Sequence, residues 1–206
     1  GLSYATSNRG GCHNRAPHDD YWGEGELAPE LGLTSDIARH RLYTGPKKAE
    51  LVVLGQDWWG ALDTIVACIF TPFPAGISIE TLVNMVSSVT GWDVTPEELM
   101  TVGERAWNLA RAFNVREGMT RKDDTLPSRF AEPLPDGLYE GQAIARDTLD
   151  RLLSHYYEYR GWDRATGAPK RVTLERLGLE SVADELEGLQ ARVPQARTPS
   201  RAAGSQ

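Results

Sequence analysis

Cysteine is scarce in this sequence, since Cys12 and Cys68 are the only two among 206 residues. A single cysteine cannot hold a metal cluster, which needs several thiolate ligands, so any partners of Cys68 as a ligand must come from elsewhere. The two cysteines could form a disulfide, but a chain of this size builds its own hydrophobic core and does not need one. A reducing compartment is therefore the better prediction.

An excess of basic residues is also missing. The formal net charge is −7, and the arginines of 189–206 leave the rest of the chain more acidic still, which argues against nucleic acid as a partner. No apolar run of about 18 residues and no basic leader with an apolar stretch occurs, so neither a membrane span nor a secretory signal is indicated. These features predict a cytoplasmic protein. The chain begins in mid-pattern without methionine, which predicts the C-terminal part of something longer.

Alternating apolar and polar runs of strand length are absent, whereas helical periodicity is frequent. The clearest local signals are Ser78, a helix cap, and the capping box that Thr95 and Glu98 form around a proline. The predicted helices cover 47–62, 79–89, 96–115 and 144–159, with a short helix pair between 174 and 190. The fold class is therefore mainly α.

Glycine, proline, aspartate and asparagine are frequent in 1–43, which predicts long irregular segments with at most short helices. Loops of that length usually carry function. Residues 118–141 are predicted to form an extended surface connection. The expected organisation is a multihelical region with long irregular loops over 1–190, followed by a disordered tail over 191–206, which has few apolar residues.

Asp63 and Cys68 lie near the end of an apolar segment. On a continuous helix five residues turn through about 500°, so the two side chains would point in different directions. If the helix instead ends near Asp63, the carboxylate lies in the last turn, where the helix dipole disfavours it by about 0.3–1 kcal/mol. Asp63 then needs a compensating partner. The alternative, from residue types alone, is an exposed aspartate and a buried, inert cysteine.

His13 follows a glycine pair that would let the backbone approach a ligand closely. Histidine titrates near neutral pH and suits general acid or base chemistry. Cys12, His13 and His18 are conceivable zinc ligands, but this is weak evidence because no second ligand pair follows at zinc-finger spacing. The alternative for an isolated histidine in such a loop is a hydrogen-bonded or solvated side chain.

Several ordered motifs extend over 1–186. They are Tyr-Ala-Thr-Ser-Asn-Arg-Gly-Gly-Cys-His at 4–13, Asp-x-x-x-x-Cys at 63–68, Gly-Trp-Asp-Val-Thr-Pro-Glu-Glu-Leu at 91–99, Gly-Glu-Arg-Ala-Trp-Asn at 103–108, Phe-Asn at 113–114, Asp-Asp-Thr-Leu-Pro at 123–127, Arg-Phe at 129–130, and Tyr-Tyr with Gly-Trp at 156–162. In this order they resemble the C-terminal part of tungsten-dependent aldehyde:ferredoxin oxidoreductases.

The resemblance implies part of an enzyme that oxidises aldehydes to carboxylic acids at a tungsten or molybdenum bis-pterin centre. Electrons would leave through a 4Fe-4S cluster to ferredoxin. It implies that Cys68 is the last of the four cysteine ligands of the cluster. His13 corresponds to the histidine near the metal, a proton donor or acceptor.

The implied pterin contacts come from four residues. Asp63 corresponds to the acid that hydrogen-bonds a pterin amine, which would supply the partner that its position at a helix end demands. Ala67 and Ile69 correspond to backbone positions against the pterin, and Arg15 to a cationic pterin contact. The resemblance leaves the substrate, the choice of tungsten or molybdenum and homo-oligomerisation open.

The sequence departs from the family in three respects. Val66-Ala67 stands where the family usually has Gly-Leu, and valine lacks the backbone freedom of glycine, so the local turn is where we expect a difference. The interval from His13 to Asp63 carries a surplus within 19–34. The other three cluster cysteines, the first pterin-binding acid, the catalytic glutamate and the N-terminal pterin-binding domain have no counterpart. The chain alone is therefore expected to be an inactive fragment or subunit that needs the missing N-terminal region; the alternative is a non-catalytic helical interaction module.

Overall fold

The computed structural model describes residues 1–18, 44–72 and 75–192. Within these ranges all regular structure is helical and no strand occurs, which confirms the mainly α fold class. The elements are α1 (Leu2–Ala5), η1 (His13–Arg15), α4 (Pro46–Thr64), α5 (Ile79–Thr90), α6 (Pro96–Arg116), η3 (Arg121–Asp123), η4 (Ser128–Ala131), α7 (Arg146–Arg160), α8 (Arg171–Arg176) and α9 (Glu180–Arg192). The predicted surplus at 19–34 lies outside the described residues.

The last helix and the predicted tail overlap. Helix α9 continues to Arg192, slightly past the predicted end of the helical region at 190. The rest of the predicted tail, 193–206, lies outside the described residues. Among the helices that the structure describes, none combines the length and the apolar character needed to cross a membrane.

The predicted caps define the helix boundaries. Ser78 Oγ accepts a hydrogen bond from the Thr81 amide at 3.2 Å, at the start of α5. The capping box at the start of α6 is complete: the Glu98 amide donates to Thr95 Oγ1 at 3.2 Å and the Thr95 amide donates to Glu98 Oε2 at 2.8 Å. Each bond satisfies an amide that the first helical turn leaves without a partner.

Helix α7 begins later than predicted, at Arg146 rather than Ile144. The Ile144 amide instead donates to the Phe130 carbonyl at 2.8 Å, which keeps Ile144 in the preceding loop. That loop also differs from the predicted extended connection, since it contains the short helices η3 and η4. Its hydrogen bonds therefore hold it in a defined path.

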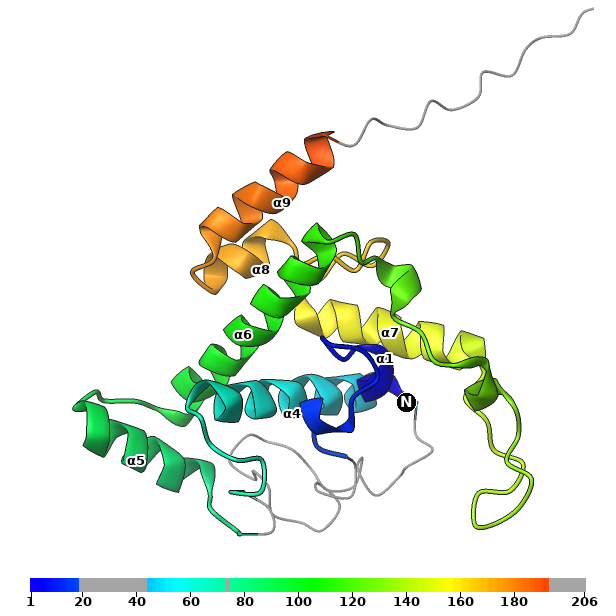
Figure 1. Ribbon diagram of the computed structural model, residues 1–206, viewed down its shortest axis with the longest axis horizontal. Helices are drawn as coiled ribbons and strands as arrows, with labels where there is room; N and C mark the ends of the chain where they lie inside the picture. Colours follow the sequence, from blue (N-terminus) through cyan, green and yellow to red (C-terminus); the bar gives the residue numbers. More distant parts are fainter. Residues whose placement is uncertain (19–43, 73–74, 193–206) are drawn as a thin grey trace, which may run out of the picture.

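Helix α4 is the centre of the fold, crossed by α6 and flanked by α7 (Figure 1). Two core clusters share it. The first joins α1, α4 and α7 with residues of α6 and the segment after α7: Leu2, Ala5, Ala49, Val53, Trp107, Leu149, Leu152, Leu153, Tyr156, Tyr157 and Trp162. The second joins the C-terminal half of α4 with α5 and the start of α6: Trp58, Trp59, Ala61, Leu62, Ile79, Leu82, Val83, Leu99 and Met100.

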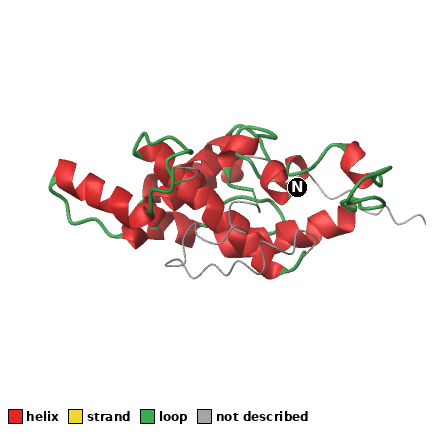
Figure 2. Ribbon diagram, turned by 90° about the horizontal axis from the view of Figure 1, so that it is seen from below, coloured by secondary structure: helices red, strands yellow, loops and turns green. Residues whose placement is uncertain are grey.

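Helix α5 lies at one end of the molecule and extends away from the other helices (Figure 2). Its contacts with the rest of the fold are confined to one side, where Ile79, Leu82 and Val83 are buried. Helices α8 and α9 pack at the opposite end of α6, through Ala112, Leu174, Ala183 and Leu186. The C-terminal end of α4 therefore lies between the core and the projecting α5.

Candidate functional site

The end of α4 is a Schellman turn. The Ala67 amide donates to the Leu62 carbonyl at 2.9 Å, and the Val66 amide donates to the Asp63 carbonyl at 3.2 Å. These two bonds fix a left-handed residue directly after the helix, a position that glycine usually occupies. Here it is Val66, with φ of 59°. The turn thus keeps the conformation that glycine would allow, at a strain of about 1–2 kcal/mol for a side chain with a Cβ.

Helix α4 ends at Thr64 rather than at the predicted 62, so Asp63 lies in its last turn, which is the second of the two cases considered above. Its partner in the structure is Arg15 of η1. Arg15 Nη1 donates to Asp63 Oδ2, and the Arg15 guanidinium carbon lies 5.7 Å from the centroid of the Trp107 ring. The cation offsets the unfavourable position of the carboxylate at the negative end of the helix. The Asp63 carboxylate is half-exposed, so its remaining lone pairs are open to a further donor.

Hydrogen bonds through Asn8 and Asn114 hold Arg15 in this position. Asn8 Oδ1 accepts a hydrogen bond from Arg15 Nε at 3.1 Å, and the Asn8 carbonyl accepts one from Asn114 Nδ2 at 2.9 Å. Sequence reasoning assigned neither asparagine a role. The signal was present, because both belong to motifs that carry the family resemblance, at 4–13 and 113–114.

Cys68 is exposed and is not part of a disulfide. Its carbonyl accepts a hydrogen bond from the Thr71 amide at 2.8 Å, which closes a tight turn. The neighbours Ala67 and Ile69 are partly buried and pack against the second core cluster, so the backbone on both sides of the cysteine is held in place. The alternative of a buried, inert cysteine is wrong for Cys68, because this side chain reaches the surface.

His13 begins η1, which packs against α4, and its side chain is exposed. The preceding Cys12 is held differently: its Sγ accepts a hydrogen bond from Arg9 Nη2 at 3.2 Å. This bond, the Asn14 amide and the charge of Arg9 lower the pKa of the Cys12 thiol. His18 contacts Tyr4, with 6.0 Å between the ring centroids.

Metal-binding side chains do not cluster within the described ranges, where no group of three or more His, Cys, Asp or Glu could hold a metal ion. The zinc alternative with Cys12, His13 and His18 therefore gains no support. Cys68 would be a ligand only together with side chains from outside the part of the chain described.

A buried polar network joins α4 to α7, and the sequence analysis did not predict it. Arg160 Nη1 donates to Asp57 Oδ1, and Arg160 Nη2 donates to Gln56 Oε1 at 2.8 Å. Burial raises the pKa of Asp57 to about 6, although the Arg160 charge opposes this rise. Tyr156 joins the network by donating to Gln56 Oε1 at 2.6 Å. The available signal was the pair Gln56-Asp57 inside the otherwise apolar stretch 51–62 of α4.

The model of the family described as aldehyde ferredoxin oxidoreductase, domains 2 & 3, matches residues 1–179. The chain belongs to the aldehyde ferredoxin oxidoreductase family. The tungsten-containing aldehyde ferredoxin oxidoreductases of Pyrococcus horikoshii and Pyrococcus furiosus are each 36% identical to it, over 183 and 182 residues. These matches cover 87% of this chain but 28% and 27% of the relatives, so the chain spans about 28% of their length.

Two further comparisons, with proteins of other names, extend this picture. The aliphatic sulfonate oxidoreductase WOR-like subunit of Pyrococcus furiosus is 33% identical over 179 residues, which is 81% of this chain and 28% of the relative. Among solved structures, the active site complex BamBC of benzoyl coenzyme A reductase superposes with a TM-score of 0.58. That match has 22% identity and covers 76% of this chain and 22% of the other. At that identity the likeness concerns the fold alone.

Proposed function

We propose that this chain is the helical part of a cytoplasmic oxidoreductase that converts aldehydes to carboxylic acids at a tungsten or molybdenum bis-pterin centre. A 4Fe-4S cluster would pass the electrons to ferredoxin. The observation that carries the proposal is the end of α4, which presents an exposed thiol, Cys68, beside the Arg15–Asp63 pair. Family membership and the tungsten-containing relatives support it.

The residues present fit one side of such a site. Thiolates are the usual ligands of iron–sulfur clusters, and Cys68 is an exposed thiol on a backbone fixed by the packing of Ala67 and Ile69. A carboxylate accepts hydrogen bonds from ring and amine N–H groups, and Asp63 is half-exposed and oriented by Arg15. The chain would thus supply one cluster ligand, Cys68, and the pterin contacts of Asp63, Arg15, Ala67 and Ile69. The missing N-terminal region would supply the rest.

Proton transfer is the step assigned to His13. When bound, the metal centre supplies the oxidation of the carbonyl carbon. The conversion of an aldehyde and water to an acid also releases protons, which a base must accept. His13 has an exposed imidazole on η1, the element that also positions Arg15 against Asp63. Since an imidazole exchanges protons near neutral pH, His13 would accept a proton during oxidation and return it to water.

The two cysteines provide a matched test in the assembled enzyme. We expect Cys68→Ser to lose the cluster's electron paramagnetic resonance signal and part of the bound iron, whereas Cys12→Ser keeps both. His13→Gln is expected to lower kcat by about 10²–10⁴-fold at unchanged metal content. An unchanged cluster signal in Cys68→Ser would refute the proposed role of this residue, and a non-catalytic helical interaction module would then be the better description.

Asp63 is tested through pterin retention. Asp63→Asn keeps the shape of the side chain but removes its charge, and with it the ion pair to Arg15. We expect the assembled enzyme to retain its iron and to lose a large part of its tungsten and pterin. Equal pterin content in the variant and the wild type would show that Asp63 serves only the helix end.

A further inference from the structure

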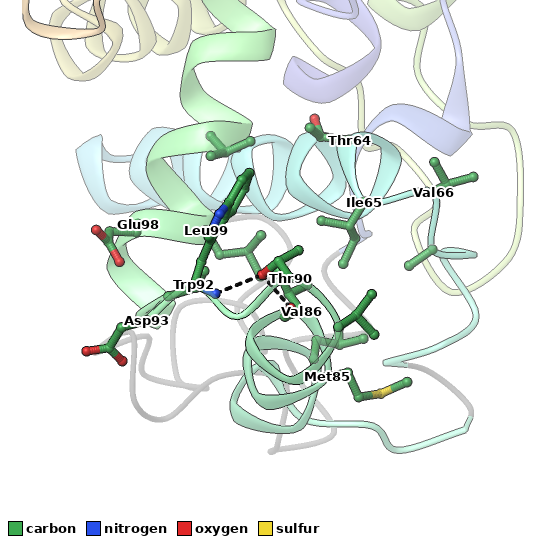
Figure 3. Close-up of a pocket in the computed structure, with 15 residues that line it drawn as sticks. Thr64, Ile65, Val66, Met85, Val86, Thr90, Trp92, Asp93, Glu98 and Leu99 are labelled. Carbon is green, nitrogen blue, oxygen red and sulfur yellow. Dashed lines mark hydrogen bonds between the residues drawn. The ribbon is translucent and has the colours of Figure 1, made fainter.

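An apolar groove opens where the C-terminal end of α4, helix α5 and the first half of α6 meet (Figure 3). Its volume is about 830 Å³. The lining is mostly aliphatic, with one tryptophan: Thr64, Ile65, Val66, Ala67, Leu82, Met85, Val86, Val89, Thr90, Trp92, Asp93, Val94, Glu98, Leu99 and Val102. The wall formed by Ile65 and Ala67 leads directly into Cys68.

Four large apolar side chains that line this groove are exposed. Val66 is 92% exposed, Val89 87%, Trp92 70% and Met85 55%. Val66 is also strained by its left-handed backbone, and its exposed side chain gains little from packing in return. A contiguous exposed apolar patch of this kind marks an interaction surface.

Of the polar groups in the groove, Thr64, Thr90 and Glu98 already form hydrogen bonds with nearby backbone groups. Thr64 Oγ1 donates to the Gly60 carbonyl at 2.8 Å, and Thr90 Oγ1 donates to the Val86 carbonyl at 2.8 Å. The Glu98 carboxylate belongs to the capping box of α6. A specific small-molecule site needs convergent polar groups that orient the ligand, and this lining offers few. The groove therefore suits an apolar protein surface.

We propose that this groove is the docking surface for the polypeptide that supplies the remaining part of the family's enzyme. The inference rests on the proposed function. The chain spans about 28% of its relatives' length, so most of the assembly lies outside it. A polypeptide that brings the other cluster ligands to Cys68 must lie beside the wall formed by Ile65, Val66 and Ala67, and that wall continues into the groove.

The chemistry of the occupant follows from the groove. It presents apolar side chains to Met85, Val89 and Trp92, as an amphipathic helix does in a hydrophobic groove. Asp93 lies at the rim, exposed, and within the described residues it has no hydrogen bond or ion pair. A lysine or arginine of the occupant would pair with this carboxylate.

The test uses the full chain, tagged and co-expressed with a polypeptide that corresponds to the N-terminal region of the family's enzyme. The variant Met85→Glu/Val89→Glu places two charges in the groove. Both sites are exposed, so the variant is expected to fold, which circular dichroism would verify. The matched control is Val172→Glu, an exposed valine of α8 outside the groove.

We expect the double variant to weaken binding by roughly 100-fold, because uncompensated charges would be buried, and the control to stay within about twofold. Asp93→Lys should weaken it by about tenfold. Wild-type affinity in the double variant would overturn the docking surface. So would a self-association of the wild-type chain that the double variant abolishes, since the occupant would then be a second copy.

Failure of the docking surface and failure of the proposed function are distinguishable. If Cys68→Ser loses the cluster signal while Met85→Glu/Val89→Glu binds normally, the function stands and the docking surface is wrong. If Cys68→Ser keeps the signal while the double variant loses the partner, the docking surface stands and the role of Cys68 fails.

Discussion

Gly103 of α6 lies directly against the backbone of α4 at Asp57, with no room for a side chain between them. A Cβ at position 103 would overlap the Asp57 carbonyl oxygen and lie 2.8 Å from the Ala61 amide nitrogen. Gly60 meets Gly103 from the other side of the same crossing, where an added Cβ would lie 2.9 Å from the Gly103 carbonyl oxygen. The crossing of α4 and α6 is therefore close enough to require glycine on both helices.

Replacing Gly103 tests this crossing. We expect Gly103→Ala to lower the free energy of unfolding by about 1–3 kcal/mol or more, because α6 must move away from α4 to accommodate the methyl group. The matched control is Gly188→Ala in α9, where no atom lies within 4 Å of an added Cβ. There alanine should stabilise by about 0.5–1 kcal/mol through its helix propensity. Urea unfolding of both variants would measure the difference, and equal effects would contradict the close crossing.

Replacing Val66 is expected to stabilise the fold, whereas replacing Gly103 is expected to destabilise it. It has φ of 59° in the turn that ends α4, and a β-branched residue is strained there. We expect Val66→Gly to raise the free energy of unfolding by about 0.5–1 kcal/mol, since relief of strain exceeds the extra entropy of an unfolded glycine. Val89→Gly, an exposed valine within α5, should instead destabilise by a few tenths of a kcal/mol. Thermal or urea unfolding separates the two, and destabilisation by both would show that Val66 is unstrained.

Asp123 and Asp124 are adjacent acids with different roles. The Asp124 side chain is fully buried and accepts from Arg111 Nη1 at 2.8 Å and from Arg111 Nη2 at 2.7 Å. Asp123 is exposed and caps a short helix, accepting from the Thr120 amide at 2.7 Å. We expect Asp124→Ala to cost about 3–5 kcal/mol, because it leaves a buried guanidinium without a counter-charge. Asp123→Ala should cost about 1 kcal/mol. Chemical unfolding distinguishes these values, and similar losses would contradict the assignment.

The helices were largely predictable because their signals are local. Caps such as Ser78 and Thr95 act within one helical turn, and they define the observed starts of α5 and α6. Which face of α6 is buried was harder to predict from the sequence. Leu109 and Phe113 recur at helical spacing with Leu99, Val102 and Ala106, which predicts an apolar face, yet both are about half exposed. The face that is buried instead carries polar residues such as Asn108.

The reason lies in partners that are distant in sequence. Asn108 is buried because its Oδ1 accepts from Trp162 Nε1 at 2.7 Å, and Arg111 is buried because Asp124 pairs with it. Hydrophobic periodicity cannot reveal such pairs, since it treats every polar residue as an exposed one.

In the candidate site, too, the individual residues could be predicted from the sequence but their contacts could not. Sequence reasoning selected Asp63 and Arg15 separately and required a partner for Asp63 at the helix end. Their pairing depends on how η1 packs against α4, a contact between segments far apart in the chain. The roles assigned to His13, Arg15, Asp63, Ala67, Cys68 and Ile69 remain predictions for the assembled enzyme.

Asp57 makes the stability of the fold depend on pH. Burial raises the pKa of its carboxyl group to about 6, whereas an aspartate in the unfolded chain titrates near 3.9. The folded state therefore binds this proton more tightly. The resulting stabilisation is complete below about pH 4 and is lost as the pH rises through about 6.

We expect the free energy of unfolding of the wild type, relative to Asp57→Asn, to fall by up to about 3 kcal/mol between pH 4 and pH 7. Urea unfolding at four or five pH values would measure this difference. The exposed control Asp93→Asn should change the free energy by less than about 0.5 kcal/mol at every pH. If the wild type instead gains stability over Asp57→Asn as the pH rises, the charge of Arg160 outweighs the cost of burying the Asp57 carboxylate. The direction of this change therefore decides whether burial or the ion pair dominates at the centre of α4.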